Sequence, residues 1–183
     1  MTALLRFKDV SCRRGGRFVF DRLSLDLNPG EALQVVGPNG SGKSSLLRLA
    51  AGLLHPEAGS VHAAPCALVD DRLALDRELR LRDALGFWGG DVEAGLEAMG
   101  LTELAAVPVR LLSAGQGKRA ALARVVASAA RLWLLDEPAN ALDAGALNSL
   151  GAAIAYHLRA GGAVVAASHT DLPGKWRTLE LSR

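Results

Sequence analysis

Residues 37–44 most constrain what this chain can fold into, because they read Gly-Pro-Asn-Gly-Ser-Gly-Lys-Ser. This is the complete pattern G-x-x-x-x-G-K-[ST] of a phosphate-binding loop, whose glycines let backbone N–H groups approach phosphate oxygens. The apolar run 33–36 before the loop predicts a strand. Residues 43–51 after it predict a helix, whose N-terminus adds partial positive charge. The sequence therefore predicts a nucleoside triphosphate site.

Two side chains of this loop have expected roles of their own. We expect Lys43 to bring positive charge to the β- and γ-phosphates, and the Ser44 hydroxyl to bind Mg²⁺. We also expect the Lys43 side chain to be exposed until a nucleotide arrives. The predicted nucleotide-binding residues are Gly37, Pro38, Asn39, Gly40, Ser41, Gly42, Lys43, Ser44 and Ser45.

A second motif follows the apolar run 132–135, which predicts a buried strand that ends in Asp136 and Glu137. In nucleotide hydrolases, an acidic residue at this end of a strand holds Mg²⁺, which is the role that we predict for Asp136. The adjacent Glu137 is then placed to polarise the attacking water as a general base. The alternative, a solvated acidic turn, would not account for a complete phosphate loop upstream.

Composition suits one compact domain, since the chain has 183 residues of which 50% are hydrophobic. The net charge is only +2, so we expect no nucleic-acid partner. No apolar stretch approaches the roughly 18 residues that span a bilayer, and residues 1–6 do not resemble a signal peptide. Cys12 and Cys66 lack metal-ligand spacing and fit core positions in a reducing cytoplasm.

Strands and helices are expected to alternate, which predicts an α/β fold with a mainly parallel sheet. Residues 78–110 have helical spacing interrupted by glycines, and with the next helix they predict a helical subdomain over about 78–130. The expected strands are 5–10, 18–27, 33–36, 61–69, 132–135 and 163–167. The remaining helices are 43–51 and 145–158, and the helix that ends the subdomain reaches about residue 130.

Residues 112–116 read Leu-Ser-Ala-Gly-Gln and precede Lys118, Arg119 and an alanine-rich helix. At this point the sequence resembles the ATP-binding-cassette (ABC) ATPases, whose signature is Leu-Ser-Gly-Gly-Gln. Residues 141–143 resemble the D-loop of that family, and His169 resembles its switch histidine. The resemblance covers nearly the whole chain. It implies one domain over 1–183, with a RecA-like P-loop NTPase core, an antiparallel N-terminal β part and the helical subdomain.

The resemblance also assigns roles to these motifs. It implies that the nucleotide is ATP and that His169 contacts its γ-phosphate beside Glu137, so that both residues are catalytic. It further implies a head-to-tail dimer, in which the signature of one copy closes over ATP held by the other copy. The signature residues that would face the partner's ATP are Ser113, Ala114, Gly115 and Gln116.

The sequence departs from the family pattern in two places. Where the family stacks the adenine on an aromatic ring, this chain has Arg14, although Phe18 is close by. Where the family has a glutamine that touches Mg²⁺, this chain has Asp70 and Asp71. An aspartate is a hard oxygen ligand, so Asp71, with Asp70 as second choice, is a candidate for Mg²⁺. The other reading is a solvated acidic loop, and the sequence leaves both open.

Within the ABC family, segments 33–43, 75–79 and 112–116 are similar to the ATP-binding subunit of the cytochrome c maturation haem exporter. That resemblance implies ATP hydrolysis coupled to two transmembrane subunits, at the cytoplasmic face of the bacterial inner membrane. Two alternatives stay open. One is the ATPase subunit of another exporter, for a lipoprotein, lipid or drug, and the other is a soluble ABC factor that transports nothing.

Overall fold

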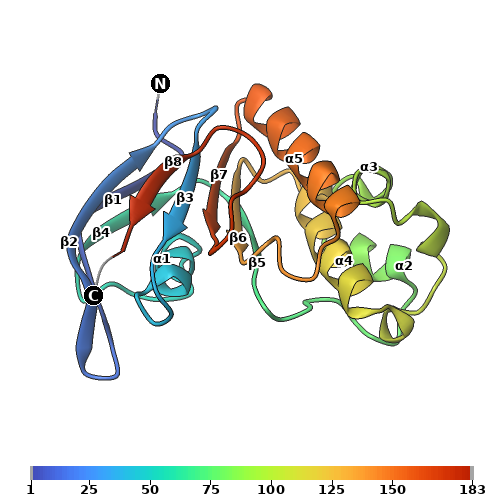
Figure 1. The fold of residues 1–183 in the computed structure, drawn as a ribbon, viewed down its shortest axis with the longest axis horizontal. Helices are drawn as coiled ribbons and strands as arrows, with labels where there is room; N and C mark the ends of the chain where they lie inside the picture. The colour runs from blue at the N-terminus through green and yellow to red at the C-terminus, as the bar shows by residue number, and fades with distance from the viewer. Residues whose placement is uncertain (1, 182–183) are drawn as a thin grey trace.

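The computed structural model describes residues 2–181 and is built around one parallel sheet (Figure 1). The ends of the predicted 1–183 domain, residues 1 and 182–183, lie outside the described residues. The sheet has five strands in the order β5-β6-β7-β3-β8, and all neighbours are parallel. These strands are β3 (Ala32–Val36), β5 (Cys66–Val69), β6 (Leu132–Asp136), β7 (Ala163–Ala167) and β8 (Arg177–Glu180).

The central strands β6 and β7 are buried at every residue. When both faces of a parallel sheet are covered, nearly every residue of its strands is apolar. The apolar runs Leu-Trp-Leu-Leu and Ala-Val-Val-Ala-Ala therefore predicted β6 and β7 correctly. The α/β fold with a parallel core and an antiparallel N-terminal part is confirmed.

One face of the parallel sheet packs against helix α1 (Lys43–Ala50) and a three-stranded antiparallel sheet of order β2-β1-β4. The antiparallel strands are β1 (Leu5–Arg14), β2 (Arg17–Leu27) and β4 (Ala58–Ala63). The prediction of one strand over 61–69 is wrong, since β4 and β5 belong to different sheets. Pro65 lies between them and has no N–H to continue a ladder.

The other face is covered by α4 (Ala114–Ala127) and α5 (Ala144–Arg159). Beyond α4, at the end of the molecule away from the antiparallel sheet, lie α2 (Leu81–Gly86) and α3 (Val92–Ala98), with short 3-10 turns at Thr102–Leu104 and Val109–Leu111 (Figure 1). These helices share one apolar core with β6 and β7. The subdomain bounds of about 78–130 therefore stay a prediction.

The carboxyl ends of β3, β6 and β7 lie at one edge of the sheet, because adjacent parallel strands point the same way. The chain leaves these ends into the phosphate loop, into Glu137 and into His169, respectively. Open α/β sheets bind their ligands at this edge.

Candidate active site

The phosphate loop joins β3 to α1 and has the tight backbone that its glycines predict. Gly37, Gly40 and Gly42 have φ angles of 145°, 81° and 103°. A Cβ on Gly37 would lie 2.4 Å from the backbone oxygen of Leu181, closer than real contacts allow. At this position only glycine fits the local backbone.

Lys43 does not extend into solvent, and the prediction of an exposed side chain is wrong. Only 7% of Lys43 is exposed. Its Nζ donates to the carbonyl oxygens of Gly37 at 2.7 Å and Pro38 at 3.2 Å, and lies 3.1 Å from Nε2 of His169. A lysine ammonium has three donors to satisfy, and the turned loop places carbonyl oxygens within its reach.

Ser44 and Asp136 form a pair of neighbouring oxygen donors, as their predicted Mg²⁺ role requires. The Ser44 hydroxyl hydrogen-bonds the Asp136 carboxylate. Burial raises the pKa of Asp136, the Ser44 hydrogen bond opposes this, and the carboxylates of Asp71 and Glu137 raise the pKa further. A hydroxyl beside a carboxylate fits a small, hard cation, which would also relieve the repulsion between these acidic groups.

Ser45, the last of the predicted nucleotide-binding residues, hydrogen-bonds the thiol of Cys12. Burial raises the pKa of that thiol above its usual value. Cys12 is thus a buried, protonated neighbour of α1 at neutral pH, as a core cysteine should be.

Glu137 combines an unusual backbone conformation with a side chain that contacts His169. Its φ angle is 44°, in the left-handed region that residues other than glycine rarely adopt. Its Oε1 lies 3.4 Å from Nε2 of His169, and the backbone N–H of His169 donates to Oε2 at 3.5 Å. The predicted base and the predicted switch histidine are therefore in direct contact.

His169 connects the phosphate loop to Glu137. Its Nε2 lies 2.9 Å from Oδ1 of Asn39, in addition to its contacts with Lys43 and Glu137. Toward Lys43 this nitrogen can only accept a hydrogen bond, whereas toward Asn39 Oδ1 and Glu137 it can only donate. The tautomer thus decides which of these contacts forms a hydrogen bond at any moment.

These side chains surround one cavity of about 400 Å³ at the sheet edge. Its lining residues are Arg14, Val19, Asn39, Gly40, Gly42, Lys43, Ser44, Ser45, Asp71, Asp136, Glu137 and His169. We refer to this space as the catalytic cavity. It collects the phosphate loop, the acidic motif and the predicted switch histidine from distant parts of the sequence.

The structure distinguishes the two aspartates that follow β5. Asp71 lines the catalytic cavity together with Ser44 and Asp136. Asp70 accepts a hydrogen bond from the Arg72 N–H at 3.0 Å and lines a neighbouring cavity, which Asp71 also borders. This placement favours Asp71 as the candidate Mg²⁺ ligand, which remains a prediction.

Arg14 and Phe18 lie together at the mouth of the site. Both border a cavity of about 490 Å³, next to Gly40 and Ser41 of the phosphate loop. The Arg13 guanidinium lies 4.9 Å from the centre of the Phe18 ring, while Arg14 also lines the catalytic cavity. Either side chain could stack on a base here.

The signature residues lie at the N-terminus of α4. Ser113 is the N-cap, and its hydroxyl accepts from the Gln116 N–H at 3.3 Å while Gln116 Oε1 accepts from the Ser113 N–H at 2.8 Å. A Cβ on Gly115 would lie 3.0 Å from the Ala141 oxygen, so the D-loop packs against this turn. Ser113 and Ala114 border the 580 Å³ cavity that also contains Asp70, separate from their own phosphate loop.

Two residues have contacts in the structure that the sequence analysis did not predict. Asp143, read only as part of the D-loop, caps α5 by accepting from the Ala146 N–H at 2.7 Å. Its position just before a predicted helix was the available signal. Lys118 donates from α4 to the backbone oxygen of Asp136 at 3.2 Å, and no local pattern indicates that contact.

Comparison with known proteins identifies the family. The family model described as "ABC transporter" matches residues 20–140. The chain is 55% identical to the cytochrome c biogenesis ATP-binding export protein CcmA of Sphingopyxis alaskensis, with 94% of this chain and 93% of that protein covered. The chain belongs to the ABC transporter family, in its cytochrome c biogenesis group.

Other relatives agree with this assignment. The protein of the same name from Novosphingobium aromaticivorans is 56% identical, over 90% of this chain and 87% of that protein. A solved structure of a putative ABC transporter ATP-binding protein from Pyrococcus furiosus has a TM-score of 0.84 and 22% identity, and covers 97% of this chain and 96% of that chain. That likeness supports the fold alone.

Membership of this ABC family confirms the α/β NTPase fold and the prediction that the chain is an ATP-binding ATPase subunit. It also confirms the resemblance to the cytochrome c biogenesis group. No helix within residues 2–181 is both long and apolar enough to cross a membrane.

Proposed function

We propose that this ABC subunit hydrolyses Mg·ATP in its catalytic cavity and drives the transmembrane subunits of a cytochrome c biogenesis exporter. The observation that carries the proposal is the meeting of Lys43, Glu137 and His169 around a single nitrogen, His169 Nε2, at the carboxyl edge of the sheet. A phosphate binder, a base and an orienting group within contact of each other are what ATP hydrolysis requires.

The chain's own residues divide the reaction between them. Lys43 exchanges the carbonyl oxygens of Gly37 and Pro38 for phosphate oxygens. Glu137 accepts the proton of the attacking water, and His169 orients the γ-phosphate and the Glu137 carboxylate. Ser44 and Asp136, with Asp71 beside them, would hold Mg²⁺, which neutralises phosphate charge when bound.

The signature of one copy would complete the ATP site of a second copy. Support comes from its placement, since Ser113 and Ala114 border a different cavity from their own phosphate loop. The N-terminus of α4 offers partial positive charge and a serine hydroxyl to a phosphate. A head-to-tail dimer brings this turn to the partner's ATP.

The names of the relatives support the proposed partners and place of action. Proteins that are 55% and 56% identical are named cytochrome c biogenesis ATP-binding export proteins. We therefore propose that the chain sits at the cytoplasmic face of the bacterial inner membrane, bound to transmembrane subunits of that system, with haem as the associated cargo.

The decisive experiment combines a trap with a partner test. A Glu137→Gln variant keeps the shape of the side chain but cannot accept a proton, so it should bind ATP, stop turnover and run as a dimer on size exclusion with ATP and Mg²⁺. Co-expression with the transmembrane subunits of cytochrome c biogenesis should yield a complex that co-purifies, and those of a lipoprotein exporter should not. Wild-type turnover in Glu137→Gln, or the opposite choice of membrane subunits, would refute the proposal.

A further inference from the structure

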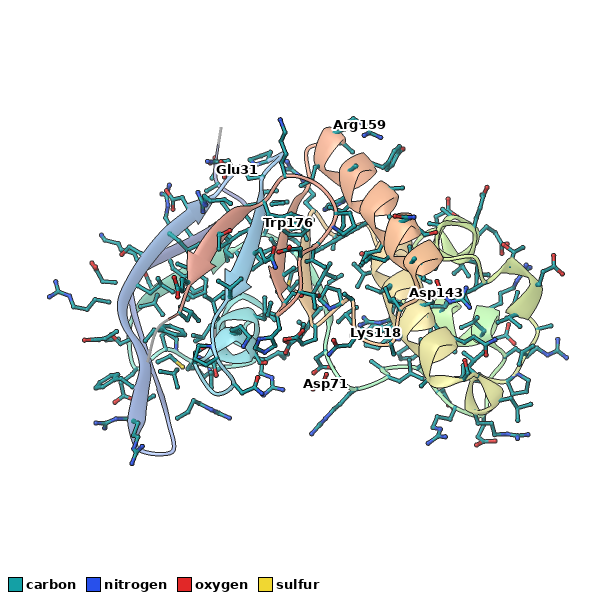
Figure 2. All side chains as sticks on the ribbon, viewed as in Figure 1. Glu31, Asp71, Lys118, Asp143, Arg159 and Trp176 are labelled. Carbon is teal, nitrogen blue, oxygen red and sulfur yellow. The ribbon has the colours of Figure 1, made fainter. Side chains whose placement is uncertain are left out.

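Lys118 is a half-buried cation beside the end of β6. It lies on α4, borders the 580 Å³ cavity together with Asp71, and reaches the end of β6, as Figure 2 shows by its position between α4 and the sheet. Neither the phosphate loop nor the acidic motif includes it.

The peptide unit between Asp136 and Glu137 is held from both sides. Its oxygen accepts a hydrogen bond from Lys118 Nζ at 3.2 Å, and its N–H donates to the Ala167 oxygen at 2.8 Å. In a trans peptide these two groups point in opposite directions, so turning the peptide plane would break both bonds. The plane is fixed between α4 and β7.

This peptide also sets the backbone of Glu137. The φ angle of Glu137, 44°, describes rotation about the bond that follows the clamped N–H. A left-handed conformation in a residue other than glycine persists only where its surroundings impose it. The same conformation puts the carboxylate in contact with His169.

We propose that Lys118 is a positioning residue for hydrolysis, whose ammonium group clamps the Asp136–Glu137 peptide and thereby aims the Glu137 carboxylate. The inference rests on the proposed function, in which Glu137 is the base. It also gives the signature helix a mechanical link to hydrolysis in the same copy, since Ser113 and Lys118 belong to one rigid helix. A shift of α4 would therefore move the peptide between Asp136 and Glu137.

The charges around Lys118 suit this role. Burial lowers the pKa of Lys118, and the carboxylates of Asp71, Asp136, Glu137 and Asp70 oppose that shift. The ammonium form keeps its donors, while its positive charge offsets the acidic groups that meet here. A methionine here, with neither N–H donors nor charge, would lose both the hydrogen bond and this compensation.

The test compares substitutions of Lys118 in the full chain by steady-state ATPase assays and ATP-binding titrations. Lys118→Met should lower kcat about 10- to 100-fold, because a small misplacement of the Glu137 carboxylate slows hydrolysis strongly. The same variant should change the ATP affinity less than about threefold. Lys118→Arg, which retains charge and donors, should recover most of the rate. Lys118→Gln, whose side chain is one bond shorter and carries no charge, should behave like Lys118→Met, so it serves if the methionine variant does not fold.

The neighbouring Arg119 supplies a matched control. Its Nη1 donates to the oxygens of Met99 and Gly100 at 3.3 and 3.2 Å, away from the catalytic cavity. Arg119→Met also removes a cation from α4 that is bonded to backbone oxygens, yet it should leave kcat of the folded protein within about twofold. An equal loss in both variants would show that Lys118 matters only for stability of the helix.

A double-mutant cycle separates this inference from the proposed function. If Lys118 acts through Glu137, adding Lys118→Met to Glu137→Gln should not lower the residual single-turnover rate further. A further drop by the same factor as in wild type would overturn the positioning role, and so would a normal kcat in Lys118→Met while Glu137→Gln is inactive. Full turnover in Glu137→Gln itself would instead refute the assignment of the base.

Discussion

Nε2 of His169 lies 3.1 Å from Nζ of Lys43, and the two residues are 126 positions apart in the sequence. The same nitrogen is 2.9 Å from Oδ1 of Asn39, which can only accept a hydrogen bond. One ring nitrogen cannot serve both neighbours at once. A phosphate oxygen placed between Lys43 and His169 would accept from both, so ATP binding would replace a conflict with a consistent set of hydrogen bonds.

Lys43→Ala should abolish ATP binding and turnover, with a loss of affinity of about 100-fold or more, because it removes the buried ammonium group at the phosphates. The fold should survive, since within residues 2–181 the Lys43 ammonium group contacts only its own loop and His169. Filter binding and circular dichroism measure the two effects. Lys175→Ala, at an exposed lysine, is the control. A folded Lys43→Ala variant with wild-type ATPase activity would refute the assignment of Lys43 to phosphate binding.

The two aspartates after β5 should respond differently to Mg²⁺. Asp71 lines the catalytic cavity, so Asp71→Ala should raise the Mg²⁺ concentration needed for half-maximal ATPase activity by about threefold or more. Asp70→Ala is the matched control, because Asp70 instead accepts from the Arg72 N–H. Titrations of ATPase activity against Mg²⁺ distinguish the two aspartates. If the Mg²⁺ dependence is unchanged in both variants, residues 70 and 71 belong to a solvated acidic loop and do not bind Mg²⁺.

His169→Ala should lower the rate of hydrolysis far more than ATP affinity. His169 orients the Glu137 carboxylate, which it contacts at 3.4 Å, whereas Lys43 and the loop keep most phosphate contacts. We expect kcat to fall about 100-fold and the dissociation constant of ATP to change less than about fivefold. Single-turnover assays with binding titrations test this, and a variant that loses ATP binding but keeps its rate per occupied site would contradict the role.

His157 should make the fold less stable in mild acid. Its ring stacks on Trp133 with centroids 3.9 Å apart, and burial lowers the pKa of His157, although hydrogen bonds with the backbone of Arg131 and Ala163 oppose the shift. As pH falls below about 6.5, the unfolded chain takes up a proton that the folded chain resists, so the free energy of unfolding decreases.

Urea denaturation at pH 7.5 and 5.5 measures this effect of His157. His157→Phe keeps an aromatic ring on Trp133 and should reduce the loss of stability between the two pH values. His62→Phe, at an exposed position of β4, should leave the loss unchanged. Equal losses in wild type and His157→Phe would show that other groups cause the pH dependence.

The parts of the fold and site that could be predicted are those encoded by contiguous patterns. Residues 37–44 specify their own loop, since the glycines, lysine and serine stand at fixed spacing. The apolar run before Asp136 indicated β6, because strands of a covered parallel sheet are apolar on both faces. The break between β4 and β5 was missed because Ala64 and Pro65 separate two strands whose partners lie elsewhere in the chain.

The sequence by itself determined the chemistry available to this protein, namely a phosphate loop, an acidic strand end and a histidine after a strand. The tertiary structure alone decided which of these groups touch. Lys43 lies against His169, 126 positions further along the chain, and Lys118 reaches the Asp136 oxygen because α4 packs against the β5 side of the sheet. Such contacts join different helices, strands and loops. The order of the parallel strands in the sheet brings these elements together, and no local sequence pattern encodes that order.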